Sequence, residues 1–231
     1  MKYLFFLGII SCVFASESIL LRPSVSSSNE IALIWIVGAG SQTESYKKLA
    51  LETQKQAAAR GVKLWIHLPA FYFDYPKPLE IDAALASSIK TLHSSGFPEG
   101  NKVFIAAHSL GTVISQWYLA AHKSNPFSGY IMMGGGLTRD RYKNDDQTGL
   151  TNIDFMPTLS IGGSLDGQYR VTRSAEAFYH QVENVSPQYK GKHPVVIIVG
   201  GSHASFMDQD VLPDFVKTHD LQADLKQSVA H

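Results

Sequence analysis

The sequence predicts an α/β fold in which a mostly parallel central sheet is covered by helices on both faces. Apolar runs typical of strands alternate with helix-type runs along the whole chain. That order calls for parallel strands joined by crossover helices. Four of the strand-type runs end in glycine pairs or near-pairs, and parallel sheets bind their ligands at the carboxyl ends of the strands. A functional site is therefore expected at this edge of the sheet.

The individual elements follow from the periodicity of apolar residues. Residues 31–37 form a continuous apolar run rich in β-branched side chains, which is typical of a strand buried on both faces. Further strands are expected at residues 62–68, 102–108, 129–133, 157–161 and 194–199, with an early edge strand at 19–21. Helices are expected at residues 41–60, 79–92, 110–122, 171–182 and 203–219. Residues 137–156 are polar and predict a solvated loop, which leaves only a minimal cap.

Composition limits the classes of partner and cofactor. Of the 231 residues 17% are charged, and the formal net charge is zero. No basic patch is visible, so no nucleic-acid partner is expected. After the first residues no apolar run is long enough to span a bilayer, so no stable membrane insertion is expected. No motif with metal-ligand spacing occurs, so neither a metal nor a cofactor is expected.

The N-terminus has the features of a secretory signal. Lys2 supplies a positive charge, residues 3–13 are mostly apolar, and Val13-Phe14-Ala15 places small residues at the −3 and −1 positions of a cleavage site. We therefore expect residues 1–15 to be a signal peptide, residues 16–28 an N-terminal segment, and residues 29–231 one domain of a secreted protein. The single cysteine, Cys12, lies in the signal, so the mature protein would have no disulfide and no thiol nucleophile. The sequon at Asn184 adds weak support.

The strand-to-helix junction at Ser109 has the pattern of a nucleophile elbow. An apolar run leads to Ser109 and a helix-type run follows at once, with small residues two positions before and after it, Ala107 and Gly111. The elbow turn is sharp, and only small flanking residues avoid the neighbouring strand and helix. A serine before an apolar helix can also be a simple N-cap. The strand before Ser109 and its small flanks favour the nucleophile.

A serine nucleophile needs a base and an orienting acid, which follow in the order acid then histidine in an elbow fold. Asp166 follows the strand that ends at Gly162-Gly163, and His203 follows the last strand. Asp140 and Asp208 are alternative acids, and the Asp-Gly pair at Asp166 could be a plain turn. His67, at another strand end, is the rival base or part of a pocket wall. The other histidines are placed on helices, within the elbow or at the opposite edge: His93, His122, His180, His219, His108 and His193.

The same junctions supply candidate donors for an oxyanion hole, which needs two N–H groups aimed at the developing negative charge. Leu110 follows the nucleophile at a helix N-terminus, where the helix dipole also favours an anion. The second donor is expected in Gly38-Ala39-Gly40, with Ala39 the first choice and Gly40 the alternative. This glycine loop lacks the G-x-G-x-x-G spacing, so a dinucleotide is not expected.

These segments together resemble the α/β-hydrolase family over residues 31–215. Ala107-His108-Ser109-Leu110-Gly111 resembles its elbow and Gly38-Ala39-Gly40 its oxyanion loop, while Ser164-Leu165-Asp166-Gly167 and Gly201-Ser202-His203-Ala204 resemble its acid and base loops. The resemblance implies a hydrolase that uses a Ser-Asp-His triad. Two positions depart from the family pattern: Ala107 replaces the first elbow glycine, and Val37-Gly38 stands where a His-Gly pair is frequent.

The leading hypothesis is therefore a secreted serine hydrolase acting on a small-molecule ester or thioester. A non-catalytic binding protein on the same fold is the alternative from another class, and a peptidase or acyltransferase is a further one, because a fold alone does not define an activity. The aromatic stretch Phe71, Tyr72, Phe73 and Tyr75 either holds an apolar part of the substrate or covers the edge of the sheet.

Overall fold

A computed structural model describes residues 16–122, 124–139, 156–184 and 191–208. Its strands form one seven-stranded sheet in the order β1-β3-β2-β4-β5-β6-β7. Only β1 is antiparallel, pairing with β3, and every other neighbouring pair is parallel. The strands are β1 (Ile19–Leu21), β2 (Glu30–Ile36), β3 (Lys63–Leu68), β4 (Val103–His108), β5 (Phe127–Met133), β6 (Thr158–Gly163) and β7 (Val195–Ile198). The predicted mostly parallel sheet is confirmed.

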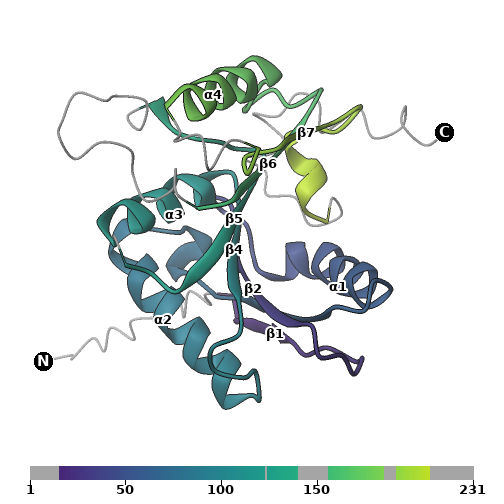
Figure 1. Ribbon diagram of the computed structural model, residues 1–231. Coiled ribbons are helices and arrows are strands. Elements are labelled where there is room, and N and C mark those ends of the chain that lie inside the picture. The colour runs from purple at the N-terminus through teal and green to yellow at the C-terminus, as the bar shows by residue number, and fades with distance from the viewer. Residues whose placement is uncertain (1–15, 123, 140–155, 185–190, 209–231) are drawn as a thin grey trace, which may run out of the picture.

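Helices cover both faces of this sheet. In Figure 1, α2 and α3 lie on one side of the strands and α1 lies on the other, while α4 packs against β6 and β7. The helices are α1 (Glu44–Ala58), α2 (Pro78–Ser94), α3 (Leu110–Ala121) and α4 (Val171–Asn184). Each follows a strand as a crossover connection, which is the arrangement that the alternating pattern predicts.

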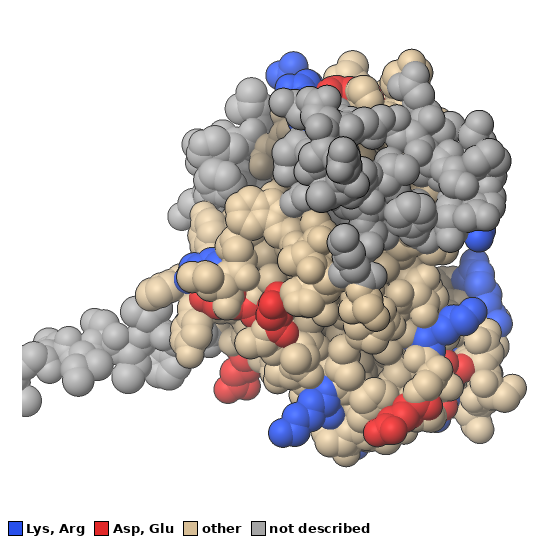
Figure 2. All heavy atoms as spheres, turned by 60° about the vertical axis from the view of Figure 1, so that its left-hand side comes forward, with Lys and Arg blue, Asp and Glu red and all other residues tan. Residues whose placement is uncertain are grey.

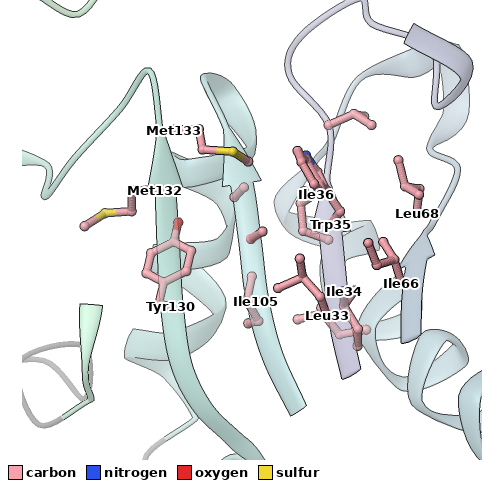
Figure 3. Close-up of a cluster of buried hydrophobic side chains, with 14 of the residues drawn as sticks. Leu33, Ile34, Trp35, Ile36, Ile66, Leu68, Ile105, Tyr130, Met132 and Met133 are labelled. Atoms are coloured by element: carbon pink, nitrogen blue, oxygen red, sulfur yellow. The ribbon is translucent and has the colours of Figure 1, made fainter. Parts of the chain in front are cut away.

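The core lies between the sheet and these helices. In β2, all of Ala32, Leu33, Ile34, Trp35 and Ile36 are buried, because helices cover the strand on both faces. Figure 3 shows Leu33, Ile34, Trp35 and Ile36 beside side chains of β3, β4 and β5. At about 25 cal/mol for each Å² of apolar surface removed from water, these strands supply much of the stability of the domain. A rigid sheet of this kind fixes the positions of the loops at its carboxyl edge.

The prediction of a helix at residues 203–219 is wrong for its first residues. Instead of an α-helix from His203, the chain forms one 3₁₀ turn, η5 (His203–Phe206), and Met207 returns to extended backbone at φ −140° and ψ 166°. The His203 carbonyl accepts a hydrogen bond from the His108 side chain at 3.1 Å, so this carbonyl bonds to a side chain rather than to the backbone of an α-helix. A second 3₁₀ turn, η1 (Tyr72–Asp74), was not predicted. The rest of the predicted helix, residues 209–219, lies outside the described residues.

Several expectations fall on parts of the chain that the structure does not describe. The signal at residues 1–15, most of the polar loop at 137–156 and most of the sequon lie there. Among the described helices, none combines the length and apolar character needed to cross a bilayer. On the face shown in Figure 2, Lys and Arg side chains are interspersed with Asp and Glu among uncharged residues.

Candidate active site

Ser109 sits on a strained turn between β4 and α3. Its backbone has φ 50° and ψ −122°, in the left-handed half of conformational space that non-glycine residues seldom occupy. The turn is held because the Ser109 N–H donates to the Met133 carbonyl of β5 at 3.0 Å, while its own carbonyl accepts from the Thr112 N–H at 2.9 Å. The serine hydroxyl is therefore presented at the carboxyl edge of the sheet.

Gly111 allows helix α3 to begin close to β2. A Cβ placed on Gly111 would lie only 2.5 Å from the Val37 carbonyl oxygen and 2.8 Å from that of Ile36. Any side chain here would push the helix and the serine away from the sheet. Ala107 is fully buried on β4, where a methyl group fits. The substitution of alanine for the first elbow glycine therefore leaves the turn intact.

The loop after β6 and the loop after β7 are bonded to each other. The Leu165 N–H donates to the Gly201 carbonyl at 2.9 Å, and the Gly200 N–H donates to Ser164 Oγ at 2.8 Å. A Cβ on Gly163 would lie 2.1 Å from the Gly201 carbonyl oxygen, so the approach requires glycine there. This contact fixes the relative positions of the acid and histidine loops.

The structure brings the three sequence-predicted residues into one hydrogen-bonded chain. His203 Nε2 lies 2.8 Å from Ser109 Oγ, and His203 Nδ1 lies 2.9 Å from Asp166 Oδ2. The other Asp166 oxygen, Oδ1, accepts the N–H groups of Gln168 and Tyr169 at 2.9 and 2.7 Å. The acid and histidine side chains are almost completely buried. A carboxylate facing Nδ1 holds the hydrogen there, which leaves Nε2 free to accept the serine proton.

A second chain of hydrogen bonds supports His203 from behind. Because the His203 carbonyl can only accept, His108 Nε2 must carry the hydrogen of their 3.1 Å bond. Burial, and after it the neighbouring His203, hold the pKa of His108 well below its usual value, so the ring is neutral and its Nδ1 is an acceptor. Tyr46 donates its hydroxyl to that Nδ1 at 2.8 Å and accepts the Gly38 N–H at 2.9 Å.

This network was only partly visible in the sequence. His108 was expected within the elbow, but Tyr46 was indistinguishable from other residues on the buried face of its helix. In the structure Tyr46 is fully buried and links α1 to the loop after β2 and to the elbow. Burial raises the pKa of Tyr46, so its hydroxyl keeps its hydrogen. No pattern within α1 indicates that one tyrosine among its apolar residues has this contact.

The network also bears on the candidate oxyanion donors. The Gly38 N–H is already bonded to Tyr46, so it is not free to bind an oxyanion. Leu110 is the first residue of α3, where an N–H has no partner within the helix. Ala39 and Gly40 follow Gly38 in the same loop, and Gly40 has φ 61°. Both remain as candidates for the second donor, with Ala39 the first choice.

The alternative catalytic residues lie elsewhere or outside the described chain. The His67 ring bonds to Ser88 of α2 at 2.9 Å rather than to the serine of the elbow. His193 bonds to Thr158 at 2.8 Å, before β7 and at the opposite edge of the sheet. The backbone N–H of Asp208 donates to the Ser45 carbonyl of α1. The carboxylate that faces His203 Nδ1 is that of Asp166. Asp140 lies outside the described residues.

The aromatic stretch after β3 lies beside the candidate oxyanion loop. Phe71 is buried, whereas Tyr72 and Phe73 are 69% and 63% exposed. A Cβ placed on Gly40 would lie 3.4 Å from the Tyr75 ring, which puts Tyr75 next to that loop. The stretch therefore combines an anchored residue with exposed aromatic surface. Across the described segments, no group of three or more His, Cys, Asp or Glu side chains could hold a metal ion.

The sheet is mostly parallel, a serine turn follows its central strand β4, and an acid and a histidine follow its last two strands. This arrangement is the α/β-hydrolase fold. Solved structures share it. The chain is similar to LpqC, a poly(3-hydroxybutyrate) depolymerase from Bordetella parapertussis, with a TM-score of 0.57 and 14% identity over 82% of this chain and 79% of that one. It is similar to Zea mays acyl-protein thioesterase 2, with a TM-score of 0.54 and 13% identity over 92% and 98% of the two chains.

A third similar structure is Est1E from Butyrivibrio proteoclasticus, with a TM-score of 0.54 and 13% identity over 91% of this chain and 92% of that one. No family model matches the chain, and no curated protein matches it by sequence. The similarity is thus one of fold, and the residues of the site carry the argument for function.

The Tyr46→Phe variant tests the supporting network. It would leave the Gly38 N–H and His108 Nδ1 without their shared partner, at a cost of about 1–3 kcal/mol in unfolding free energy. Because the base would then be less firmly placed, we expect kcat to fall by up to about 100-fold with little change in KM. Steady-state kinetics and urea unfolding measure the two effects.

Tyr130→Phe is the matched control for Tyr46→Phe. Tyr130 is also buried, and its hydroxyl donates to the Thr112 carbonyl at 2.8 Å without contacting His108. We expect a similar loss of stability but a much smaller loss of kcat. Equal effects of the two variants on kcat would show that Tyr46 has no role in placing the base.

Three buried histidines predict how stability depends on pH. Burial lowers the pKa of His67 to about 4 from an ordinary 6.5, and it lowers those of His108 and His193 in the same direction. Below pH 6.5 the unfolded chain therefore binds protons that the folded chain does not. The part of the unfolding free energy that depends on these neutral histidines is fully present above pH 6.5. It is lost as the pH falls toward 4, at about 1.4 kcal/mol per pH unit for each histidine. Urea unfolding between pH 7.5 and 4.5 measures this slope. His67→Phe should flatten it, and parallel curves would contradict the prediction.

Proposed function

We propose that the protein is a serine hydrolase that cleaves carboxylic esters or thioesters through an acyl-enzyme. The observation that carries this proposal is the placement of His203 between Ser109 and Asp166, at 2.8 and 2.9 Å. Serine, imidazole and carboxylate in this order can generate an alkoxide nucleophile at neutral pH, which none of the three could do alone. The thioesterase and depolymerase names of the similar structures agree with this chemistry.

In the proposed reaction Ser109 Oγ attacks the carbonyl carbon while His203 Nε2 takes its proton. The tetrahedral oxyanion accepts hydrogen bonds from the Leu110 and Ala39 N–H groups. As the intermediate collapses, the bond to the leaving oxygen or sulfur breaks and His203 returns the proton to it. Water then attacks the acyl-enzyme with His203 again as base, which releases the acid and restores Ser109.

We further propose that the protein is exported and acts on a small-molecule ester. The charge at Lys2, the apolar run and the small residues before Ser16 support a signal that is cleaved after Ala15. The balanced charge supports a partner other than nucleic acid, and no association with a membrane beyond the signal is needed. N-terminal sequencing of the exported protein should read Ser16 first, and a retained Met1 would contradict the proposal.

Turnover of p-nitrophenyl esters tests the proposed activity. We expect hydrolysis of the acetate and butyrate, with a burst of p-nitrophenol equal to the enzyme concentration if deacylation is the slower step. The corresponding anilides would react far more slowly if the protein is an esterase rather than a peptidase. Folded protein that turns over none of these esters or thioesters would instead support a non-catalytic binding protein on the same fold.

A further inference from the structure

A cavity of about 440 Å³ lies away from the three residues of the active site. It is lined by the end of β3, by the segment that follows, by one face of α2, and by Ser18 just before β1. Ser109, Asp166 and His203 contribute nothing to its walls, and β2 lies between β3 and the strand that carries the serine. A volume of this size is in the range of pockets that hold small organic ligands.

His67 forms part of the wall and its hydrogen position can be assigned. Its side chain is buried, with the residue only 3% exposed, and Nδ1 lies 2.9 Å from Ser88 Oγ. Ser88 donates its single hydroxyl hydrogen to the Ala84 carbonyl at 2.7 Å, so toward His67 its oxygen can only accept. His67 Nδ1 must therefore carry the hydrogen. Burial lowers the pKa of this histidine to about 4, so the ring is neutral at pH 7 and Nε2 holds a lone pair.

That lone pair has no partner within the described part of the chain. Nδ1 is the ring atom that bonds to protein. The fully buried polar atoms without a partner do not include Nε2, so this atom is not closed off from solvent. Nε2 therefore remains accessible, in a residue that lines the cavity. A ligand that fills the cavity would remove water from this acceptor, and an acceptor buried without a hydrogen-bond donor is costly, so a ligand that supplies a donor is favoured.

The rest of the wall selects against a charged ligand. No Lys or Arg of the described chain lines the cavity, and its one charged residue, Glu80, is paired with Lys77 at 3.2 Å. A carboxylate or phosphate would therefore find no counter-charge. Small apolar side chains and hydroxyls of α2 line the cavity, as with Ala83 and Ser87, and the 97% exposed Leu79 also lines it. Such walls suit a neutral, mostly apolar molecule.

We propose that this cavity is a second binding site, for a small apolar alcohol or phenol whose hydroxyl donates to His67 Nε2. The proposal does not depend on the activity assigned to Ser109, because among the described residues neither the triad nor the candidate oxyanion donors line this cavity.

Titration with 2-naphthol and with its methyl ether tests the site, because only the naphthol can donate a hydrogen bond. We expect saturable binding of 2-naphthol by calorimetry, and binding of the ether at least tenfold weaker. In ¹⁵N-labelled protein, the Nε2 resonance of His67 should move toward the value of a hydrogen-bonded acceptor. Ser109→Ala should bind 2-naphthol as well as the wild type does, which separates this site from the active site.

Two exposed positions on α2 give matched variants that should not disturb folding. Ala83 lines the cavity, so Ala83→Leu should fill it and abolish 2-naphthol binding. Ala86 is also exposed on α2 but does not line the cavity, so Ala86→Leu should bind like the wild type. Absence of saturable binding, equal affinity for the ether, or unchanged binding by Ala83→Leu would each overturn the proposal. Loss of binding after Ser109 is blocked by a covalent inhibitor would overturn it as well.

Discussion

Ser109→Ala is expected to reduce kcat for ester hydrolysis by about five to six orders of magnitude, the scale at which removal of a triad serine acts. Ser109 Oγ is the atom within 2.8 Å of His203 Nε2, and alanine leaves the imidazole with no hydroxyl to deprotonate. The proposed oxyanion donors belong to the backbone and would remain, so a small residual rate over water is expected. Stopped assays at high enzyme concentration would measure both rates.

Ser115→Ala is the matched control for this loss. Ser115 is a buried serine on the same helix, and its hydroxyl makes no hydrogen bond to His203 or Asp166. Its removal should leave kcat within a few-fold of the wild type. If Ser109→Ala and Ser115→Ala both retain activity, Ser109 is not the nucleophile.

Asp166→Asn is expected to reduce kcat by about 10⁴-fold at pH 7 without unfolding the protein. The backbone N–H groups of Gln168 and Tyr169 donate to Oδ1 of Asp166, so an asparagine at this position would keep its side-chain carbonyl oxygen there. Its NH₂ group would then face His203 Nδ1, where Oδ2 now lies at 2.9 Å. His203 could only meet that donor with an unprotonated Nδ1, which places the hydrogen on Nε2 and removes the base.

The acid role can be separated from its alternatives with the same assay. Asp208→Asn should retain activity, since Asp166 occupies the position beside His203 Nδ1. An unchanged rate in Asp166→Asn would instead move the acid role to Asp140. Circular dichroism and urea unfolding of each variant would show that a lost rate does not reflect lost folding.

The parts of the fold that could be predicted from the sequence are those with a strong local pattern. The continuous apolar run of β2 and the glycine pairs at the end of β6 and after β7 are local signals, and they predicted the strands and the loops at their ends. Ser109, Asp166 and His203 could be grouped from the sequence because parallel strands bring their carboxyl ends to one edge. Their hydrogen bonds then follow from the contact between the acid and histidine loops.

Other features depend on contacts between residues far apart in the chain. Tyr46 is separated by 62 residues from His108, its hydrogen-bond partner, and nothing within α1 reveals that contact. The short turn η5 replaces a predicted helix because the His203 carbonyl is drawn to a side chain of the elbow, 95 residues away. The free acceptor of His67 likewise depends on how Ser88 directs its hydrogen, which no periodicity encodes.

Labelling with a fluorophosphonate tests the central claim most directly, because the probe reacts with a serine only where a base activates it. The folded protein is expected to take up one probe molecule, on Ser109 by peptide mass spectrometry, and Ser109→Ala should take up none. Labelling of Asp166→Asn should be slowed in parallel with its kcat. A folded protein that stays unlabelled, or that is labelled at another residue, would contradict the assignment of Ser109 as the nucleophile.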